Sequence, residues 1–251
     1  MTLVNQKAPV FQAKAVVNGS DIVDFDLSSI IGKHYIVLFF YPKDFTFVCP
    51  TELHAFQDKL PEFQKRDTQI IACSTDSEYA HLAWLNQPKT QGGVQGITYP
   101  VVADINKTVA RAYGVLDGEV PVSALKQTLT HQLQQVQAVK NLLQSKVASL
   151  PGLESLTSAA SLMESSEAAI PELTPADQVA FRALFIVDKK GIVQHASVNN
   201  MALGRNVDEV LRLIDALQHV EQFGEVCPAN WHSGAPAMKP TAESTAAYLT
   251  K

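Results

Sequence analysis

Residues 39–52 read Phe-Phe-Tyr-Pro-Lys-Asp-Phe-Thr-Phe-Val-Cys-Pro-Thr-Glu, and this stretch decides the fold. The apolar run that leads into it, residues 35–40, is typical of a buried strand. Pro42 predicts the end of that strand because proline cannot donate to a sheet ladder. After Cys49, Pro50 suits the first turn of a helix, and the apolar residues that follow recur at helical spacing. The pattern therefore places Cys49 in or just before the first turn of a helix.

That position favours a reactive Cys49. The free N–H groups and the positive dipole end of a helix favour a thiolate over a thiol. Thr46 lies three residues earlier, where its hydroxyl could bond to the sulfur or to an oxygen bound beside it, and Pro42 could shield one side from water. Taken alone, Cys49 could equally be a buried structural cysteine.

The stretch resembles the active-site segment of the typical 2-Cys peroxiredoxins, in which a proline, a threonine and a cysteine at this spacing precede Pro-Thr-Glu. Two later segments carry the same resemblance. Residues 181–185, Phe-Arg-Ala-Leu-Phe, are similar to the family's Tyr-Arg-Gly-Leu-Phe. Residues 224–231, Gly-Glu-Val-Cys-Pro-Ala-Asn-Trp, differ from the family's usual segment only at Asn230. The chain is thus identified as a member of that family, of the alkyl hydroperoxide reductase C or thioredoxin peroxidase type.

The resemblance implies an enzyme that reduces hydrogen peroxide and organic hydroperoxides. Cys49 would attack one peroxide oxygen and become a sulfenic acid. Arg182 would hold the thiolate and the developing oxyanion, and Glu52 would orient that arginine. Cys227 would resolve the sulfenic acid as a disulfide between two subunits, which implies a homodimer. The expected catalytic residues are Pro42, Thr46, Cys49, Glu52, Arg182 and Cys227.

The same resemblance implies the partners. Thioredoxin or a similar disulfide reductase is the expected reductant, and no cofactor is expected. The histidines and cysteines form no cluster with zinc spacing, so no metal is expected either. Relatives also join dimers into a decameric ring, and a long insertion leaves open whether this chain does.

The order of the expected strands and helices along the chain predicts an α/β fold of three layers with a central mixed sheet. The family resemblance narrows this prediction to a thioredoxin-like fold. Cys73 lies in a second apolar strand and reads as a core residue. Residues 1–116 and 178–251 are the expected peroxiredoxin domain. Between them, residues 117–177 carry apolar side chains three, four or seven apart, which favours an inserted helical hairpin. That hairpin is either a self-packed surface element or a contact for another subunit or partner.

Composition excludes several classes of partner. The net charge of −5, without a long basic cluster, disfavours nucleic acid and anionic membranes. No apolar run reaches the roughly 18 residues of a membrane span. The first seven residues lack the charged start and apolar core of a signal peptide. We therefore expect a cytoplasmic protein.

Two other functions compete with the peroxidase. A thioredoxin-like disulfide exchanger needs a Cys-x-x-Cys pair, which is absent from the sequence. A ring-forming chaperone or scaffold, acting through the insertion, would not need the residues of the peroxidase motifs. Those residues are all present, which favours the enzyme.

Overall fold

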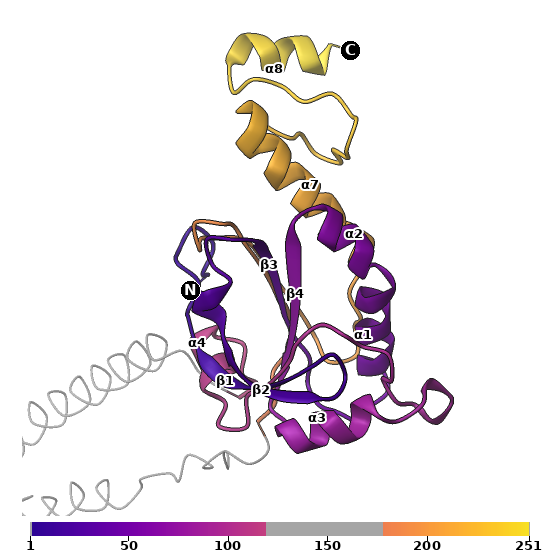
Figure 1. The fold of residues 1–251 in the computed structure, drawn as a ribbon. Coiled ribbons are helices and arrows are strands. Elements are labelled where there is room, and N and C mark those ends of the chain that lie inside the picture. Colours follow the sequence, from indigo (N-terminus) through magenta and orange to yellow (C-terminus); the bar gives the residue numbers. More distant parts are fainter. Residues whose placement is uncertain (1, 119–177, 251) are drawn as a thin grey trace, which may run out of the picture. The chain divides into compact units, whose positions relative to one another are not determined.

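The computed structural model describes residues 2–118 and 178–250 (Figure 1). Met1–Asp117 and Val179–Lys251 belong to one compact unit. The hairpin expected at 117–177 lies almost wholly outside the described residues. The strands of the described unit are β1 (Gln12–Val17), β2 (Asp21–Asp26), β3 (Tyr35–Phe40), β4 (Thr68–Ser74), β5 (Val101–Ala103), β6 (Arg182–Val187) and β7 (Val193–Asn199). The helices are α1 (Cys49–Asp58), α2 (Leu60–Lys65), α3 (Glu78–Leu85), α4 (Thr108–Ala112), α7 (Val207–Phe223) and α8 (Ala242–Leu249), with short 3-10 turns at Leu27–Ser29 and Lys89–Gln91.

The strands form one mixed sheet in the order β2-β1-β5-β4-β3-β6-β7. Strand β3 pairs parallel with β4 and antiparallel with β6, and β4 pairs parallel with β5. All six residues of β3 are buried, as expected for a central strand whose two faces are both covered. The predicted α/β fold with a central mixed sheet and a thioredoxin-like arrangement is confirmed.

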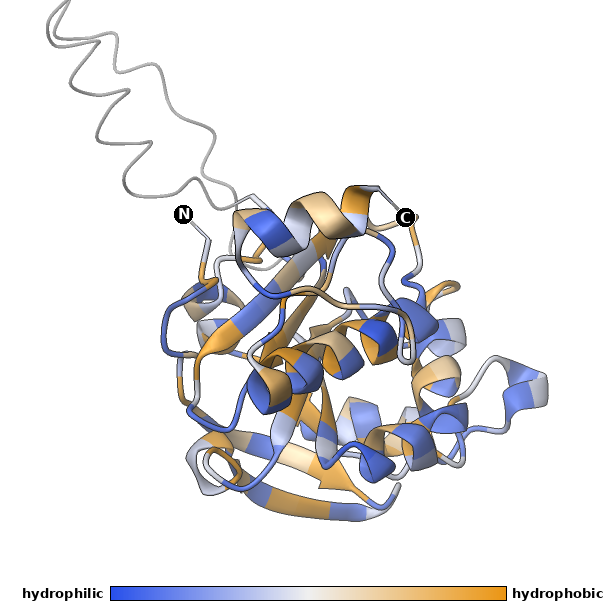
Figure 2. Cartoon of the chain, turned by 90° about the horizontal axis from the view of Figure 1, so that it is seen from above, coloured by the Kyte–Doolittle hydropathy of each residue, from blue (hydrophilic) through white to orange (hydrophobic). Residues whose placement is uncertain are grey.

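Two hydrophobic cores lie on the two faces of this sheet, because side chains alternate along a strand. Phe39 packs on one face with residues of α1, α2, α3 and α7, including Phe56 and Ile214. Phe40 packs on the other face with residues such as Leu27 and those of α4. Figure 2 shows hydrophilic and hydrophobic residues side by side on the helices, as expected where one side of a helix faces a core. The covered sheet holds the carboxyl end of β3, where the active-site stretch begins.

Three elements differ from the sequence prediction. Strands β1 and β2 form an antiparallel hairpin where no strand was predicted. The helix after Cys49 ends at Asp58, and α2 starts separately with Pro61 in its first turn. The C-terminal tail, to which no element was assigned from the sequence, contains α8, which Thr241 caps through its side chain.

Helix α7 ends after Phe223, where Gly224 adopts the left-handed conformation. Within the described ranges, we find no helix that combines the length and the hydrophobicity needed to cross a membrane.

Candidate active site

Cys49 is the first residue of α1, and its side chain has no exposed surface. Pro50 follows in the first turn, where the missing N–H of proline costs no helical hydrogen bond. The loop that joins β3 to this turn contains Phe45 at a φ of 56°, a left-handed conformation that non-glycine residues rarely adopt. The surrounding structure therefore has to hold this loop in place.

A buried polar network holds the loop. Asp44 accepts hydrogen bonds from the Tyr41 hydroxyl at 2.7 Å and from His81 Nδ1 at 2.7 Å. The other ring nitrogen of His81 lies 3.2 Å from the carbonyl oxygen of Val102. The backbone N–H of Asp44 donates to Asp76 Oδ2 at 2.9 Å. The active-site loop is thus tied to α3, β4 and β5 through its own aspartate.

A cluster of buried charges faces the sulfur. Arg182, the first residue of β6, places Nη1 3.4 Å from Cys49 Sγ and 2.6 Å from Glu52 Oε2. Glu52 lies one turn along α1 from Cys49, so helical geometry brings both side chains to the same face. The side chains of Arg182 and Glu52 are 4% and 3% exposed. A guanidinium held this close to a sulfur favours negative charge on it.

Arg205 completes the cluster, and sequence reasoning missed it. Its guanidinium bonds to both oxygens of Glu52 at 2.8 Å, and its Nη1 donates to the carbonyls of Phe40 and Ala183 at 2.7 Å. Arg205 comes from the segment just before α7, far from Glu52 in sequence. In the sequence, the feature that could have drawn attention to Arg205 is its position directly before Asn206, the N-cap of α7.

The cluster of two arginines and one glutamate carries one excess positive charge. Burying an unbalanced charge is costly, so a partner of opposite sign stabilises it. A thiolate at Cys49 would bring the sum to zero. Cys49 is also the residue that Arg182 contacts.

Two other residues of the stretch, Thr46 and Pro42, were expected in the site. The Thr46 hydroxyl donates to the carbonyl of Lys43 at 2.8 Å rather than to the sulfur. Its donor is therefore used by the loop, while its oxygen lone pairs remain available as acceptors. Pro42 is buried at the end of β3.

The remaining cysteines have different environments. Cys73 lies in β4, and complete burial raises its thiol pKa well above the ordinary value. Cys227 follows α7 and is half-buried, with Sγ 3.7 Å from the carbonyl oxygen of Ala216. Burial also raises the pKa of Cys227, although nearby Arg212 acts in the opposite direction. All three thiols are free, so the structure corresponds to a reduced chain.

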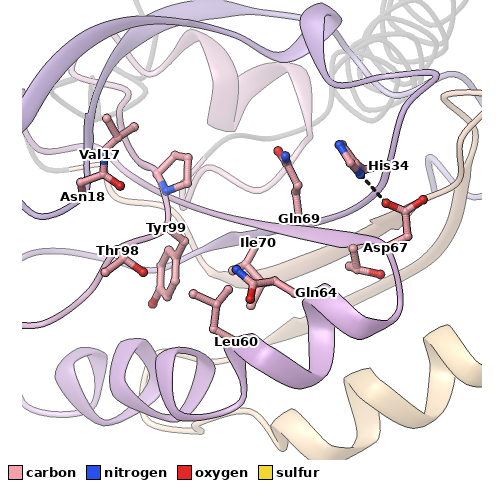
Figure 3. Close-up of a pocket in the computed structure, with 12 residues that line it drawn as sticks. Val17, Asn18, His34, Leu60, Gln64, Asp67, Gln69, Ile70, Thr98 and Tyr99 are labelled. Carbon is pink, nitrogen blue, oxygen red and sulfur yellow. Dashed lines mark hydrogen bonds and ion pairs between the residues drawn. The ribbon is translucent and has the colours of Figure 1, made fainter.

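A cavity of about 510 Å³ lies at the other end of the parallel strands (Figure 3). His34 and Asp67, which bond to each other in its wall, immediately precede β3 and β4. Cys49 instead follows the carboxyl end of β3, the edge where open α/β sheets place their functional sites. The cavity therefore does not belong to the Cys49 site.

Comparison with known proteins shows the family of the chain. The model of the AhpC/TSA family matches residues 4–196, and that of the C-terminal domain of 1-Cys peroxiredoxin matches residues 216–251. The chain belongs to the AhpC/TSA family, among its 2-Cys peroxiredoxins. A thioredoxin peroxidase of Echinococcus granulosus is 38% identical over 99% of the chain and 98% of its own length.

Two further peroxiredoxin-type relatives are similar over nearly the whole chain. Alkyl hydroperoxide reductase C of Helicobacter pylori is 37% identical over 98% of the chain and 96% of its own length. A crystal structure of reduced 2-Cys peroxiredoxin from Plasmodium vivax is 36% identical and superposes with a TM-score of 0.76 over the full length of both chains. The family membership expected from the sequence motifs is confirmed.

Proposed function

We propose that this 2-Cys peroxiredoxin is a thiol-dependent peroxidase in which Cys49 attacks the peroxide and Cys227 resolves the product. The observation that carries the proposal is the 3.4 Å approach of Arg182 Nη1 to Cys49 Sγ inside a buried cluster with an excess positive charge. Such a site stabilises an ionised sulfur and the negative oxygen that the reaction releases. Relatives named thioredoxin peroxidase and alkyl hydroperoxide reductase C support the same activity.

The first step transfers one oxygen to sulfur. The Cys49 thiolate attacks one peroxide oxygen, a sulfur–oxygen bond forms and the oxygen–oxygen bond breaks. The other oxygen leaves with the bonding electron pair and takes a proton to become water or an alcohol. Arg182 donates to the charge that develops on this oxygen, and the Thr46 oxygen accepts from the bound peroxide. Glu52 and Arg205 position Arg182 but do not touch the reacting atoms.

The second step forms a disulfide with loss of water. The residues just before α7 lie against the start of α1. A Cβ atom placed on Gly204 would be only 3.5 Å from Val48 Cγ1. From there α7 leads away toward α8 (Figure 1). The Cys227 sulfur packs at Ala216, which at 1.5 Å per residue is about 14 Å along the helix from Val207. This distance favours resolution by Cys227 of a second subunit, and hence a homodimer.

Several finer points belong to the same proposal. The substrates are hydrogen peroxide and organic hydroperoxides, the reductant is thioredoxin or a similar disulfide reductase, and the location is the cytoplasm. Residues 1–116 and 178–251 form the peroxidase domain, and residues 117–177 form an inserted helical hairpin. The compact unit of Met1–Asp117 and Val179–Lys251 supports this division. Dimers could join into a decamer if the insertion leaves the contact surface free.

A coupled assay tests the function. Consumption of hydrogen peroxide is followed with thioredoxin, thioredoxin reductase and NADPH, for the unmodified chain and for Cys49→Ser. We expect turnover only with Cys49. In the same preparation, reduction of insulin disulfides tests the rival exchanger, and suppression of thermal aggregation of a client protein tests the chaperone. Peroxide consumption that persists in Cys49→Ser would refute the proposal.

A further inference from the structure

The segment that carries Cys227, residues 224–231, is docked on α7 of its own chain. Val226 exchanges two backbone hydrogen bonds with Met238, at 2.8 and 3.2 Å, which closes the segment into a short antiparallel bridge. Trp231 is only 3% exposed. The Cys227 sulfur rests against the carbonyl of Ala216 in the middle of the helix. The half-buried thiol is therefore held against α7.

Four side chains attach this segment to α7, and we name them the docking cluster: Arg212, His219, Glu225 and Trp231. Arg212 Nη1 donates to the carbonyl oxygen of Trp231 at 2.8 Å. Glu209 holds the same guanidinium from the other side through two bonds of 2.6 and 2.7 Å. Arg212 is thus preorganised to fix the end of the segment that follows Cys227.

His219 fixes the end that precedes Cys227. Its Nε2 lies 3.0 Å from Glu225 Oε2, two residues before the cysteine. Its ring centroid lies 4.9 Å from that of Trp231 and 4.7 Å from that of Phe223. One histidine therefore contacts both flanks of the segment, and Arg212 contacts the second flank independently.

Docking has a chemical consequence for the thiol. Because burial raises the pKa of Cys227, the docked thiol is a poorer nucleophile than a free one. Cys49 is buried in its own pocket, so the two sulfurs cannot meet while both segments keep this arrangement. The docked arrangement is therefore a resting position, and the segment has to leave α7 before it can react.

We propose that His219 and Arg212 are positioning residues that hold Cys227 in this unreactive resting position and set the rate of its release. The proposal rests on the peroxidase function proposed above. On release, Cys227 sulfur attacks the Cys49 sulfenic acid. A sulfur–sulfur bond forms, the sulfur–oxygen bond breaks, and the oxygen leaves with the thiol proton as water. Weakening the docking cluster should speed this step and leave the peroxide step unchanged.

The first experiment measures the release of the Cys227 segment from α7 in the absence of catalysis. In a Cys49→Ser background, Cys227 alkylation by excess iodoacetamide is followed by mass spectrometry, with the buried Cys73 as internal reference. His219→Phe keeps an aromatic ring between Trp231 and Phe223 but removes the partner of Glu225. We expect about a threefold faster alkylation, as suits the loss of one partly exposed hydrogen bond. Glu225→Gln, which leaves the ring stack untouched, should give a similar change.

The matched control is Asp215→Asn. Asp215 lies on the same helix and pairs with Arg66 at 2.6 Å, and its side chain is 19% exposed, against 20% for His219. It does not contact the Cys227 segment in any hydrogen bond or ion pair among the described residues. Breaking this pair should leave the alkylation rate as it is. A rise equal to that of His219→Phe would show a general loosening of α7 and would refute the proposal.

The second experiment reads catalysis. Rapid-quench mass spectrometry after one equivalent of hydrogen peroxide separates sulfenic acid formation at Cys49 from disulfide formation. We expect His219→Phe to raise the rate of disulfide formation about threefold and Arg212→Gln about tenfold, with the peroxide step unchanged. Arg212→Lys, which keeps the charge but not the planar fork, should fall between Arg212→Gln and the unmodified chain.

The outcomes separate the two proposals. If peroxide does not react with Cys49, the proposed function fails, while the alkylation data still report the docking cluster. If the peroxide step proceeds and every docking variant alkylates and forms disulfide at the unmodified rate, His219 and Arg212 have no positioning role. Slower disulfide formation in His219→Phe and Glu225→Gln would mean that docking assists the reaction, which also overturns the proposal.

Discussion

The surroundings of Cys49 and Cys227 differ in kind. Around Cys49, the side chains of Glu52 and its two arginine partners are at most 4% exposed, and Arg205 also bonds to the backbone of β3 and β6. Around Cys227, the pair of His219 with Glu225 is 20% and 34% exposed. Breaking a buried pair typically costs about 3–5 kcal/mol, whereas a surface pair contributes about 0.2–1 kcal/mol. The first arrangement fixes a reactive sulfur, and the second holds a sulfur that can be released.

The largest expected effect separates the two cysteines by role. Cys49→Ser should abolish peroxide reduction, because it removes the sulfur that Arg182 contacts. Cys227→Ser should still cleave one equivalent of peroxide but form no disulfide between subunits. Peroxide loss with one equivalent of reduced protein, followed by non-reducing electrophoresis, measures both. Repeated thioredoxin-supported turnover by Cys227→Ser would show that another thiol or the reductant itself resolves Cys49.

Removing the carboxylate at the centre of the buried cluster tests the comparison by stability. Glu52→Gln leaves Arg182 and Arg205 buried beside each other without their shared anion, so we expect a loss of about 3–5 kcal/mol in the free energy of unfolding. Glu225→Gln, on the surface of the molecule, should cost less than about 1 kcal/mol. Urea denaturation of the reduced proteins gives both numbers. Equal losses would mean that the two environments do not differ in the way described.

Substitution of Arg182 should slow the peroxide step more than substitution of Arg205. Arg182→Ala removes the donor beside the Cys49 sulfur, and a hydrogen bond to a charged group is worth about 1.5–3 kcal/mol, or roughly 10- to 100-fold in the peroxide step. Arg205→Lys keeps a cation beside Glu52 but loses the bonds to the ends of β3 and β6. It should lower stability with a smaller loss of rate. Stopped-flow rates and urea midpoints for both variants show whether the contributions separate.

The start of α1 could be predicted from the sequence because the residues that determine it lie close together in the chain. A buried strand, Pro42 as a break and Pro50 as a first-turn residue lie within a few positions of Cys49. Arg182 and Glu52 were named through motifs, and the structure places Arg182 against the sulfur and Glu52 against Arg182. Arg205 was missed because its function comes from a tertiary approach to Glu52, which no local pattern announces.

The missed β1–β2 hairpin had a local signal. Asn18-Gly19 occupies its turn with both residues at positive φ, a pairing that favours tight turns between strands. The flanking strands are only partly buried, so their hydrophobic alternation is weak. Helix α8 was hidden in the same way, because its sequence lacks an apolar stripe and none of its residues is buried.

The smallest expected effect is a pH dependence on the Cys49 side of the comparison. His54 lies on α1, and its Nε2 is 3.2 Å from the carbonyl oxygen of Gly93, which links the Cys49 helix to the loop that contains Gly92 and Gly93. Its other nitrogen, Nδ1, is buried with no hydrogen-bond partner in the part of the chain that the structure describes. Burial lowers the pKa of His54 below its ordinary 6.5, and Lys89 lowers it further, while the Gly93 carbonyl and Asp58 oppose the shift. A proton on His54 therefore favours the unfolded chain.

The sign of the effect follows from this lowered pKa. Between pH 6.5 and the folded-state pKa, the unfolded chain binds more protons at His54 than the folded chain does, so stability falls as the solution is acidified. His54→Leu should lose this part of the pH dependence, while His195, whose pKa is also lowered by burial, keeps its own share. Urea midpoints at pH 7.5 and 5.5 should differ less in His54→Leu than in the unmodified chain. Amide exchange should show α1 opening more readily at pH 5.5 only when His54 is present. An unchanged difference between the midpoints would mean that His54 does not couple acidification to the helix that carries Cys49.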